Sequence, residues 1–116
     1  MGKDGCLFCR IVKKEIPVNV VLESLQFLAF EDVNPQAPVH ILVIPKEHVE
    51  KISDLNDRRT AMVGALVLAA KDIARQQGIE ESGYRIVMNC NRDAGQAVFH
   101  LHLHLLGGRK FAWPPG

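Results

Sequence analysis

The segment HLHLHL, residues 100–105, places three of the chain's five histidines at alternate positions, His100, His102 and His104. Side chains of a β-strand point alternately to its two faces. The pattern therefore predicts a strand over 98–106 with the histidines on one face and the intervening leucines in the core. A buried neutral imidazole needs hydrogen-bond partners for its ring nitrogens. Three of them on one face indicate chemistry rather than chance.

A single metal ion does not explain these three histidines. A strand rises about 3.4 Å per residue, so the outer two histidines would lie roughly 13 Å apart, whereas zinc holds imidazole nitrogen at about 2.1 Å. A group of neutral imidazoles without carboxylates suits nucleophilic attack at phosphorus. The ordinary histidine pKa of about 6.5 leaves the ring mostly neutral at pH 7. Flanking rings can then hold a phosphate and protonate a leaving group.

Length and charge narrow the class of protein. A chain of 116 residues is predicted to form one domain over 1–116, which needs neither a disulfide nor a metal to fold. The net charge is +1 without a Lys/Arg run, so no nucleic-acid partner is expected. The N-terminal residues resemble neither a signal peptide nor a membrane span, and three cysteines, an odd number, are typical of a reducing compartment. The expectation is a cytoplasmic protein without a membrane partner.

Hydrophobic periodicity and turn residues predict an α+β fold. Five strands with mostly short connections favour an antiparallel sheet, and one long helix presents an apolar stripe to it. A short N-terminal helix precedes the sheet and is closed by Pro17. The predicted elements are a short helix at 7–14, strands at 18–24, 25–32, 40–45, 83–89 and 98–106, and the long helix at 57–77.

Several stretches together resemble one known family. The run from His100 to Leu106 matches the histidine triad pattern, in which three histidines alternate with apolar residues. The sequences DVNPQAPVHILVIPKEH (32–48), GYRIVMN (83–89), GQAVFHLHLHLLGGR (95–109) and WPPG (113–116) are similar to the Hint branch of that family. The resemblance covers nearly the whole chain. It implies a purine nucleoside phosphoramidase that cleaves the P–N bond of adenosine or guanosine 5′-phosphoramidates and releases AMP or GMP.

The resemblance also implies roles for individual residues. His102 would be the nucleophile that forms a nucleotidyl-histidine intermediate, His104 would face the leaving group, and His40 and His100 would support them. Catalysis would need no cofactor. The implied substrate-binding residues share contact with the nucleotide: Asn89 and Gln96 at the phosphate, Asp32 at the ribose, and Phe8, Ile11, Ile16, Phe30, Val33 and Leu42 around the base.

A homodimer is expected, with the sheet continuing across its two-fold axis as the resemblance implies. The long helix and the strand at 83–89 are apolar enough to leave exposed apolar surface in a monomer. Trp113 is the expected anchor of the proline-rich C-terminal segment and would reach the partner subunit near its active site.

The motif CLFC, with Cys6 and Cys9, is found in other histidine triad proteins. A C-x-x-C spacing lets both sulfurs face one ion, and the resemblance implies a structural zinc completed by His48 and His100. The alternative without zinc stays open for two reasons. A domain of this size folds without metal, and buried cysteines often act as small hydrophobic residues. A redox pair is disfavoured, since no thioredoxin-like strand and helix follow.

Two further functions compete with the phosphoramidase. The same pocket would serve an AMP-binding regulatory module whose turnover is incidental, and other members of the superfamily hydrolyse dinucleoside polyphosphates. The WPPG ending and the spacing from Gln96 to the first triad histidine favour the Hint branch. The chain departs from that branch at Ala97, where a hydroxyl residue is common, which puts the rate in question.

Overall fold

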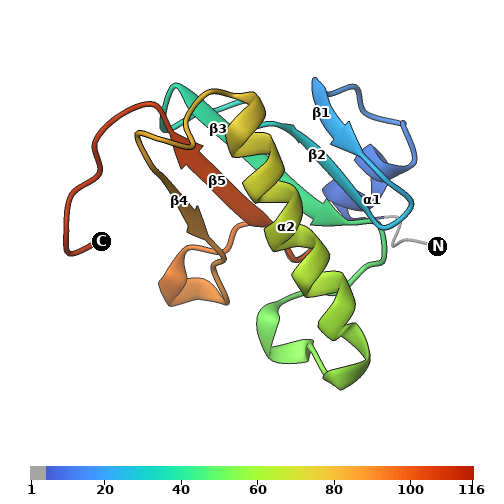
Figure 1. The fold of residues 1–116 in the computed structure, drawn as a ribbon. Coiled ribbons are helices and arrows are strands. Elements are labelled where there is room, and N and C mark those ends of the chain that lie inside the picture. Colours follow the sequence, from blue (N-terminus) through green and yellow to red (C-terminus); the bar gives the residue numbers. More distant parts are fainter. Residues whose placement is uncertain (1–4) are drawn as a thin grey trace.

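The computed structural model describes residues 5–116, which form a five-stranded antiparallel sheet with one long and one short helix, as the sequence predicts (Figure 1). The strand order across the sheet is β1-β2-β3-β5-β4. The elements are α1 (Leu7–Val12), β1 (Val20–Glu23), β2 (Phe27–Glu31), β3 (Val39–Pro45), α2 (Thr60–Gln76), β4 (Tyr84–Val87) and β5 (Leu103–Gly107).

The long helix α2 covers one face of the sheet (Figure 1). Residues alternate along each strand, so every second side chain of β2, β3 and β5 turns toward this helix. On the helix, a stripe at helical spacing meets them. The resulting core contains Ala29, Ile41, Val43, Leu103 and Leu105 from the strands and Leu66, Ala69, Ala70, Ile73 and Ala74 from α2.

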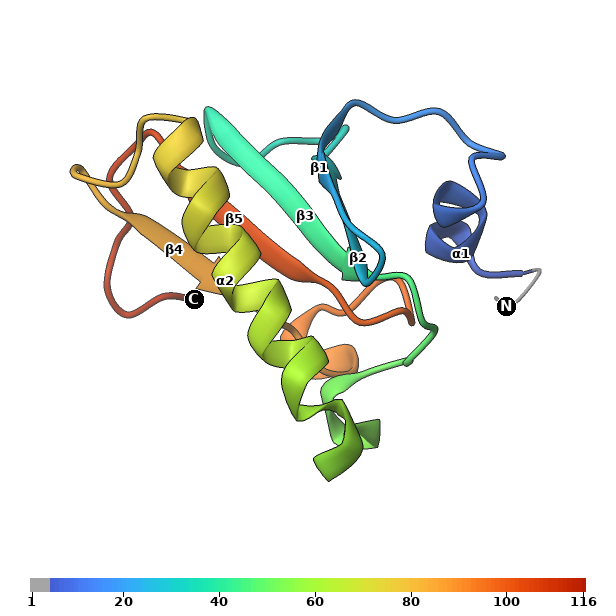
Figure 2. The same ribbon diagram turned by 45° about the vertical axis from the view of Figure 1, so that its right-hand side comes forward.

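The short helix α1 packs on the opposite face and covers only part of it (Figure 2). Phe8 and Ile11 contact the strand residues that alternate with the first set, namely Leu28, Phe30, Leu42 and Ile44. Cys6 caps the helix, since its sulfur accepts a hydrogen bond from the backbone N–H of Cys9 at 3.4 Å. Among residues 5–116, no helix covers the part of this face formed by β5 and β4 (Figure 2). His104 is in β5, and His100 and His102 precede it.

The predicted strand at 98–106 is wrong in its first half, because β5 begins only at Leu103. In the register of β3 with β5, Val43 lies opposite Leu103, so Pro45 would lie opposite Leu101. Proline has no N–H to donate, and the ladder ends before it. The N–H of Leu101 bonds instead to the carbonyl of Val49 at 2.7 Å.

The other predicted boundaries that differ from the structure do so by one to three residues, and two of these differences have a local cause. The long helix starts at Thr60, because Asp57–Arg59 form a 3-10 turn rather than its first α-helical turn. β5 stops at Gly107 because Gly108 has a φ of +90° and a Cβ there would lie 2.8 Å from Pro38. Among the helices of residues 5–116, none is long and apolar enough to cross a membrane.

Candidate active site

His102 lies just before β5, buried against α1. Its Nδ1 is 2.8 Å from the backbone carbonyl oxygen of His100, and the ring of Phe8 meets it edge-on with 5.1 Å between centroids. A carbonyl oxygen only accepts hydrogen bonds, so Nδ1 carries the ring proton and Nε2 has the free lone pair. Orientation and tautomer therefore suit a nucleophile that reacts through Nε2.

His40 and His104 form a hydrogen-bonded chain next to it. The backbone N–H of Gln36 donates to Nδ1 of His40 at 3.0 Å, so neutral His40 carries its proton on Nε2. That nitrogen lies 2.9 Å from Nδ1 of His104, which therefore accepts. The ring of His104, 5.0 Å from that of His102 between centroids, consequently has its own proton on Nε2.

Both members of this chain are uncharged at pH 7. Burial, with His102 and His40 as neighbours, lowers the pKa of His104 to about 4. Burial also lowers the pKa of His40, opposed by the carboxylate of Asp32. The negative charge of a bound phosphate would stabilise the protonated imidazole and raise these pKa values. The site is therefore ready to take up a proton when an anion enters.

Asp32, His40 and His104 have ligand-type atoms within 4.8 Å of one another, which is close enough for a metal ion. The tautomers argue against that reading. Because Gln36 donates to Nδ1 of His40, the nitrogen that faces the group carries a proton and has no free lone pair. The three residues are better described as a chain of polar contacts that ends on the Asp32 carboxylate, 3.4 Å from Nε2 of His40.

A cavity of about 390 Å³ opens beside His102 and His104 on the face of the sheet that α1 covers in part. Apolar side chains form most of its wall, and polar groups lie at its His102 end. The predicted site residues that line it are Phe8, Ile11, Ile16, Phe30, Asp32, Val33, Leu42, Asn89, His102 and His104. Six more residues line the cavity that the sequence did not assign to the site, and each lies within two positions of a predicted residue: Leu7, Pro17, Val18, Gly95, Ala97 and Val98.

Two of the predicted substrate-binding residues lie elsewhere. Trp113 is 82% exposed and does not line this cavity. Gln96 is buried, and its amide bonds only to backbone: Nε2 donates to the carbonyls of Glu50 at 2.8 Å and Val98 at 3.1 Å, and Oε1 accepts from the N–H of Asn91 at 2.8 Å. Both amide hydrogens are thereby used, and none is left to donate to a phosphate.

The geometry gives Gln96 a different task, which is to hold the loop between β4 and β5. Asn91 has a φ of 70° and a ψ of −175°, a backbone conformation that is costly for any residue except glycine. The side chain of Gln96 bonds to the N–H of Asn91 and its own N–H bonds to the Asn91 carbonyl at 3.1 Å. These bonds keep the strained residue in place.

Replacing Gln96 with leucine is expected to destabilise the fold by about 2–4 kcal/mol, because three partly buried backbone groups lose the hydrogen bonds to its side chain. The melting temperature should fall by about 10 °C, measured by circular dichroism. Gln76→Leu, at the exposed end of α2, is the control and should melt like the wild type. Loss of turnover in Gln96→Leu with an unchanged melting temperature would instead indicate a direct phosphate contact.

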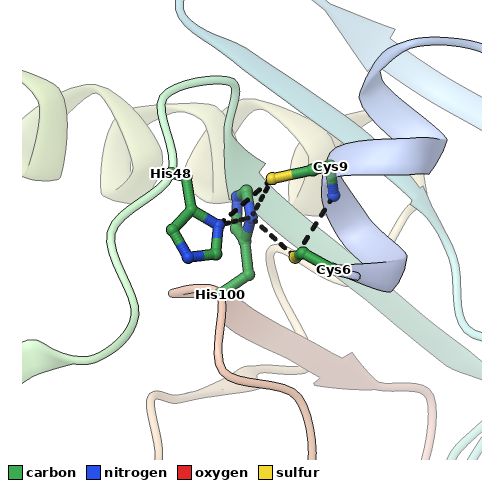
Figure 3. Close-up of side chains that lie close together, drawn as sticks. All are labelled: Cys6, Cys9, His48 and His100. Atoms are coloured by element: carbon green, nitrogen blue, oxygen red, sulfur yellow. Dashed lines mark hydrogen bonds between the residues drawn. The ribbon is translucent and has the colours of Figure 1, made fainter. Parts of the chain in front are cut away.

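A second group of four side chains converges around the ring of His100, which is one of its members (Figure 3). Cys6 and Cys9 come from the start of α1, His48 follows β3, and His100 precedes β5. Their ligand-type atoms all lie within 4.8 Å of one another. The structure thus brings together the four residues that the sequence suggested for a metal.

The spacing of these atoms matches a tetrahedral ion. Zinc at ordinary bond lengths would separate a sulfur from a nitrogen by about 3.6 Å and two nitrogens by about 3.3 Å. Nδ1 of His100 is 3.5 Å from each sulfur, Nδ1 of His48 is 3.1 Å from the sulfur of Cys9, and the two nitrogens are 3.2 Å apart. Nε2 of His100 donates to the carbonyl of Pro45 at 2.8 Å, which leaves Nδ1 as a bare lone pair toward the group.

His100 thereby connects the two sites. Its ring faces the sulfurs, and its backbone carbonyl holds Nδ1 of His102. Phe8, between the two cysteines, meets both His100 and His102 edge-on.

Residues 13–111 match the HIT domain family. An uncharacterized HIT-like protein of Synechococcus elongatus is 51% identical over 97% of this chain and 98% of its own length. A 14 kDa zinc-binding protein of Zea mays is 47% identical over 95% of this chain and 87% of its own.

Solved structures are similar throughout. A HIT family hydrolase from Legionella pneumophila superposes with a TM-score of 0.95 at 50% identity, covering 97% of this chain and all of the other. A histidine triad nucleotide-binding protein from Candida albicans has a TM-score of 0.81 at 30% identity, covering 97% of this chain and 85% of the other. Sequence and structural comparisons therefore agree.

Proposed function

The chain belongs to the HIT family, and from that membership we propose that it is a purine nucleoside phosphoramidase. The supporting observation is the oriented ring of His102, whose Nδ1 donates to the carbonyl of His100 and whose Nε2 is free beside an apolar cavity. The solved relative described as a hydrolase supports the class of reaction. The relative described as nucleotide-binding supports a nucleotide as the ligand.

In the first step Nε2 of His102 attacks phosphorus. A bond forms between Nε2 and phosphorus as the P–N bond of the substrate breaks. The ring becomes positively charged, and the hydrogen bond from Nδ1 to the carbonyl of His100 strengthens as it does so. Since this bond is stronger in the charged intermediate than in the free enzyme, it lowers the barrier.

The proton for the departing amine comes through His104. When the phosphate anion raises the pKa of His104 from about 4, Nδ1 of the ring takes up a proton and its hydrogen bond from His40 breaks. Nε2 of His104 then passes its own proton to the leaving nitrogen. The carboxylate of Asp32, 3.4 Å from Nε2 of His40, balances the added charge. Water then attacks phosphorus, neutral His104 accepts its proton, and His102 is regenerated with release of the mononucleotide.

The nucleotide occupies the 390 Å³ cavity. Its purine lies between the apolar side chains of α1 and the strands, among Phe8, Ile11, Phe30 and Leu42. Asp32, at the cavity wall, accepts hydrogen bonds from the ribose hydroxyls. The phosphate lies at Asn89, His102 and His104. Because the nucleophile is an imidazole that needs no activated water, catalysis takes no metal or other cofactor.

Zinc is the metal that fits Cys6, Cys9, His48 and His100. Two cysteines and two histidines in tetrahedral spacing are its usual structural ligands, and a 47% identical relative is described as zinc-binding. Burial raises the pKa of the Cys6 thiol, so a bound cation is needed to stabilise its thiolate form. Bound zinc would supply a cross-link between α1 and the segment before β5, and no chemistry at phosphorus.

A homodimer is the proposed assembly. Val67 and Leu68 on α2 are 42% and 58% exposed, and Ile86 on the edge strand β4 is 37% exposed. Exposed apolar side chains on a helix and on an edge strand favour association with a second copy. Trp113, with 82% of its surface exposed, would gain burial against that copy.

A substrate comparison tests the reaction. Adenosine 5′-phosphoramidate should be hydrolysed to AMP with a kcat/KM at least about 100-fold above that for diadenosine tetraphosphate, without added Mg²⁺. Release of AMP is followed by chromatography. A guanosine phosphoramidate belongs in the same experiment, and uridine phosphoramidate is the control for the base. Preferred hydrolysis of diadenosine tetraphosphate would show that the protein is a dinucleoside polyphosphate hydrolase. Binding of AMP without turnover of either compound would favour a regulatory module.

A further inference from the structure

A second cavity, of about 410 Å³, adjoins the proposed nucleotide pocket. Both cavities are lined by Asn89 and His104, whereas His102 lines only the nucleotide pocket. The phosphate is proposed to lie at these shared residues. In phosphoryl transfer the attacking and leaving atoms are roughly in line, so a group displaced by His102 points away from His102. The second cavity meets this requirement, because Asn89 and His104 line it and His102 does not.

Two cations line this second cavity. Arg85 on β4 and Arg109 after β5 lie against the ring of Phe111, with guanidinium carbons 5.1 Å and 4.2 Å from its centroid. This arrangement fixes both guanidinium groups at the cavity wall.

The hydrogen bonds of these arginines go to neutral groups. Arg85 donates to the carbonyl of Ala112 at 3.1 Å. Arg109 donates to the carbonyls of Gln36 at 3.0 Å and Lys110 at 3.1 Å. Across residues 5–116, no acidic side chain forms an ion pair with either one. Each guanidinium has five N–H donors, so donors remain for a ligand.

A purely structural role explains only part of this arrangement. Holding the C-terminal segment requires donors to its carbonyls, which a neutral amide would also provide. Two uncompensated positive charges on one cavity instead favour an anion. Guanidinium groups match a carboxylate or phosphate with paired hydrogen bonds. The volume lies in the usual range for small-molecule pockets.

We propose that this cavity binds the leaving group, and that Arg85 and Arg109 select leaving groups that carry an anion, such as an amine with a carboxylate. The inference rests on the proposed function, because it takes the position of the phosphate from it. The P–N bond breaks as described above, and the amine departs with its carboxylate still paired to the arginines. The substrates it indicates are nucleotidyl adducts of amino acids rather than of simple amines.

The test compares two substrates that differ only in charge. AMP linked through nitrogen to β-alanine carries a carboxylate, and AMP linked to β-alaninamide carries a neutral amide of nearly equal size. For the wild type, kcat/KM should be about tenfold or more higher for the carboxylate. Arg85→Gln and Arg109→Gln should reduce this ratio to about one to three. Lys110→Gln removes a charge from the same segment but outside the cavity wall, and should keep the wild-type ratio.

The outcomes are separable. Equal kcat/KM of the wild type for the β-alanine and β-alaninamide adducts would overturn the leaving-group inference but not the proposed phosphoramidase activity. This measurement does not depend on whether any variant folds. Where Arg85→Gln does not fold, Arg85→Lys keeps one charge without the paired donors and should give an intermediate ratio. Faster cleavage of diadenosine triphosphate than of both AMP adducts would show that the selected anion is a phosphate chain. That result would overturn the proposal that the enzyme cleaves P–N bonds. No turnover of any compound would overturn the proposed function.

Discussion

Replacing His102 with alanine is expected to lower kcat for cleavage of adenosine 5′-phosphoramidate by at least about 1,000-fold, because no other imidazole has its free nitrogen beside the cavity in the same orientation. AMP should still bind within about tenfold of the wild type, since the apolar wall of the pocket is unchanged. Single-turnover kinetics and equilibrium binding of AMP measure the two quantities.

A labelled substrate gives the second part of this test. The wild type should form a nucleotidyl-histidine adduct within one turnover time, and His102→Ala should form none. Retention of more than a few percent of kcat in the variant would place the nucleophile elsewhere. An adduct that forms far more slowly than steady-state turnover would mean that the covalent route is not the catalytic one.

The double substitution Cys6→Ser/Cys9→Ser is expected to abolish zinc binding and to lower the melting temperature by about 10 °C or more. Structural zinc contributes directly to folding free energy, and here it would connect α1 to the segment that contains His100. Loosening α1 should also raise KM, since Phe8 and Ile11 line the nucleotide cavity. Elemental analysis of untagged protein should give about one zinc per chain for the wild type.

Cys90→Ser is the matched control for this experiment. Cys90 lies outside the group, where its sulfur is 3.3 Å from the hydroxyl of Ser53, so the variant should keep its zinc and its melting temperature. Wild-type protein with well under one zinc per chain, together with a double variant that melts like the wild type, would show that the four residues pack without metal.

The alternation of histidine and leucine was enough to predict which side chains of the segment face the core and which face the site. Leu101, Leu103 and Leu105 enter the core beneath α2, as the pattern predicts, because a residue's side of an extended chain depends only on its parity. The same local reasoning found the five strands and both helices, since the periodicities of apolar residues and the turn residues act over a few positions.

Which partner each histidine meets was decided by tertiary structure. In the ladder between β3 and β5, Leu42 pairs with His104 and His40 with Leu106, which brings Nε2 of His40 to Nδ1 of His104 across 64 positions of sequence. His100, in the same triad, has its ring turned to Cys6, Cys9 and His48 instead. Gln96 was expected at the phosphate and bonds to backbone.

The physical reason is the range of each interaction. Periodicity and turn chemistry are properties of neighbouring residues, so the sequence by itself determined the elements, their buried sides and the residue types available for chemistry. Hydrogen-bond partners, tautomers and pKa values depend on groups that only the register and packing of distant strands bring within about 3 Å. The end of a ladder at Pro45, the proton on Nε2 of His40 and the pairing of Arg85 with Arg109 around Phe111 were therefore fixed only when the chain folded.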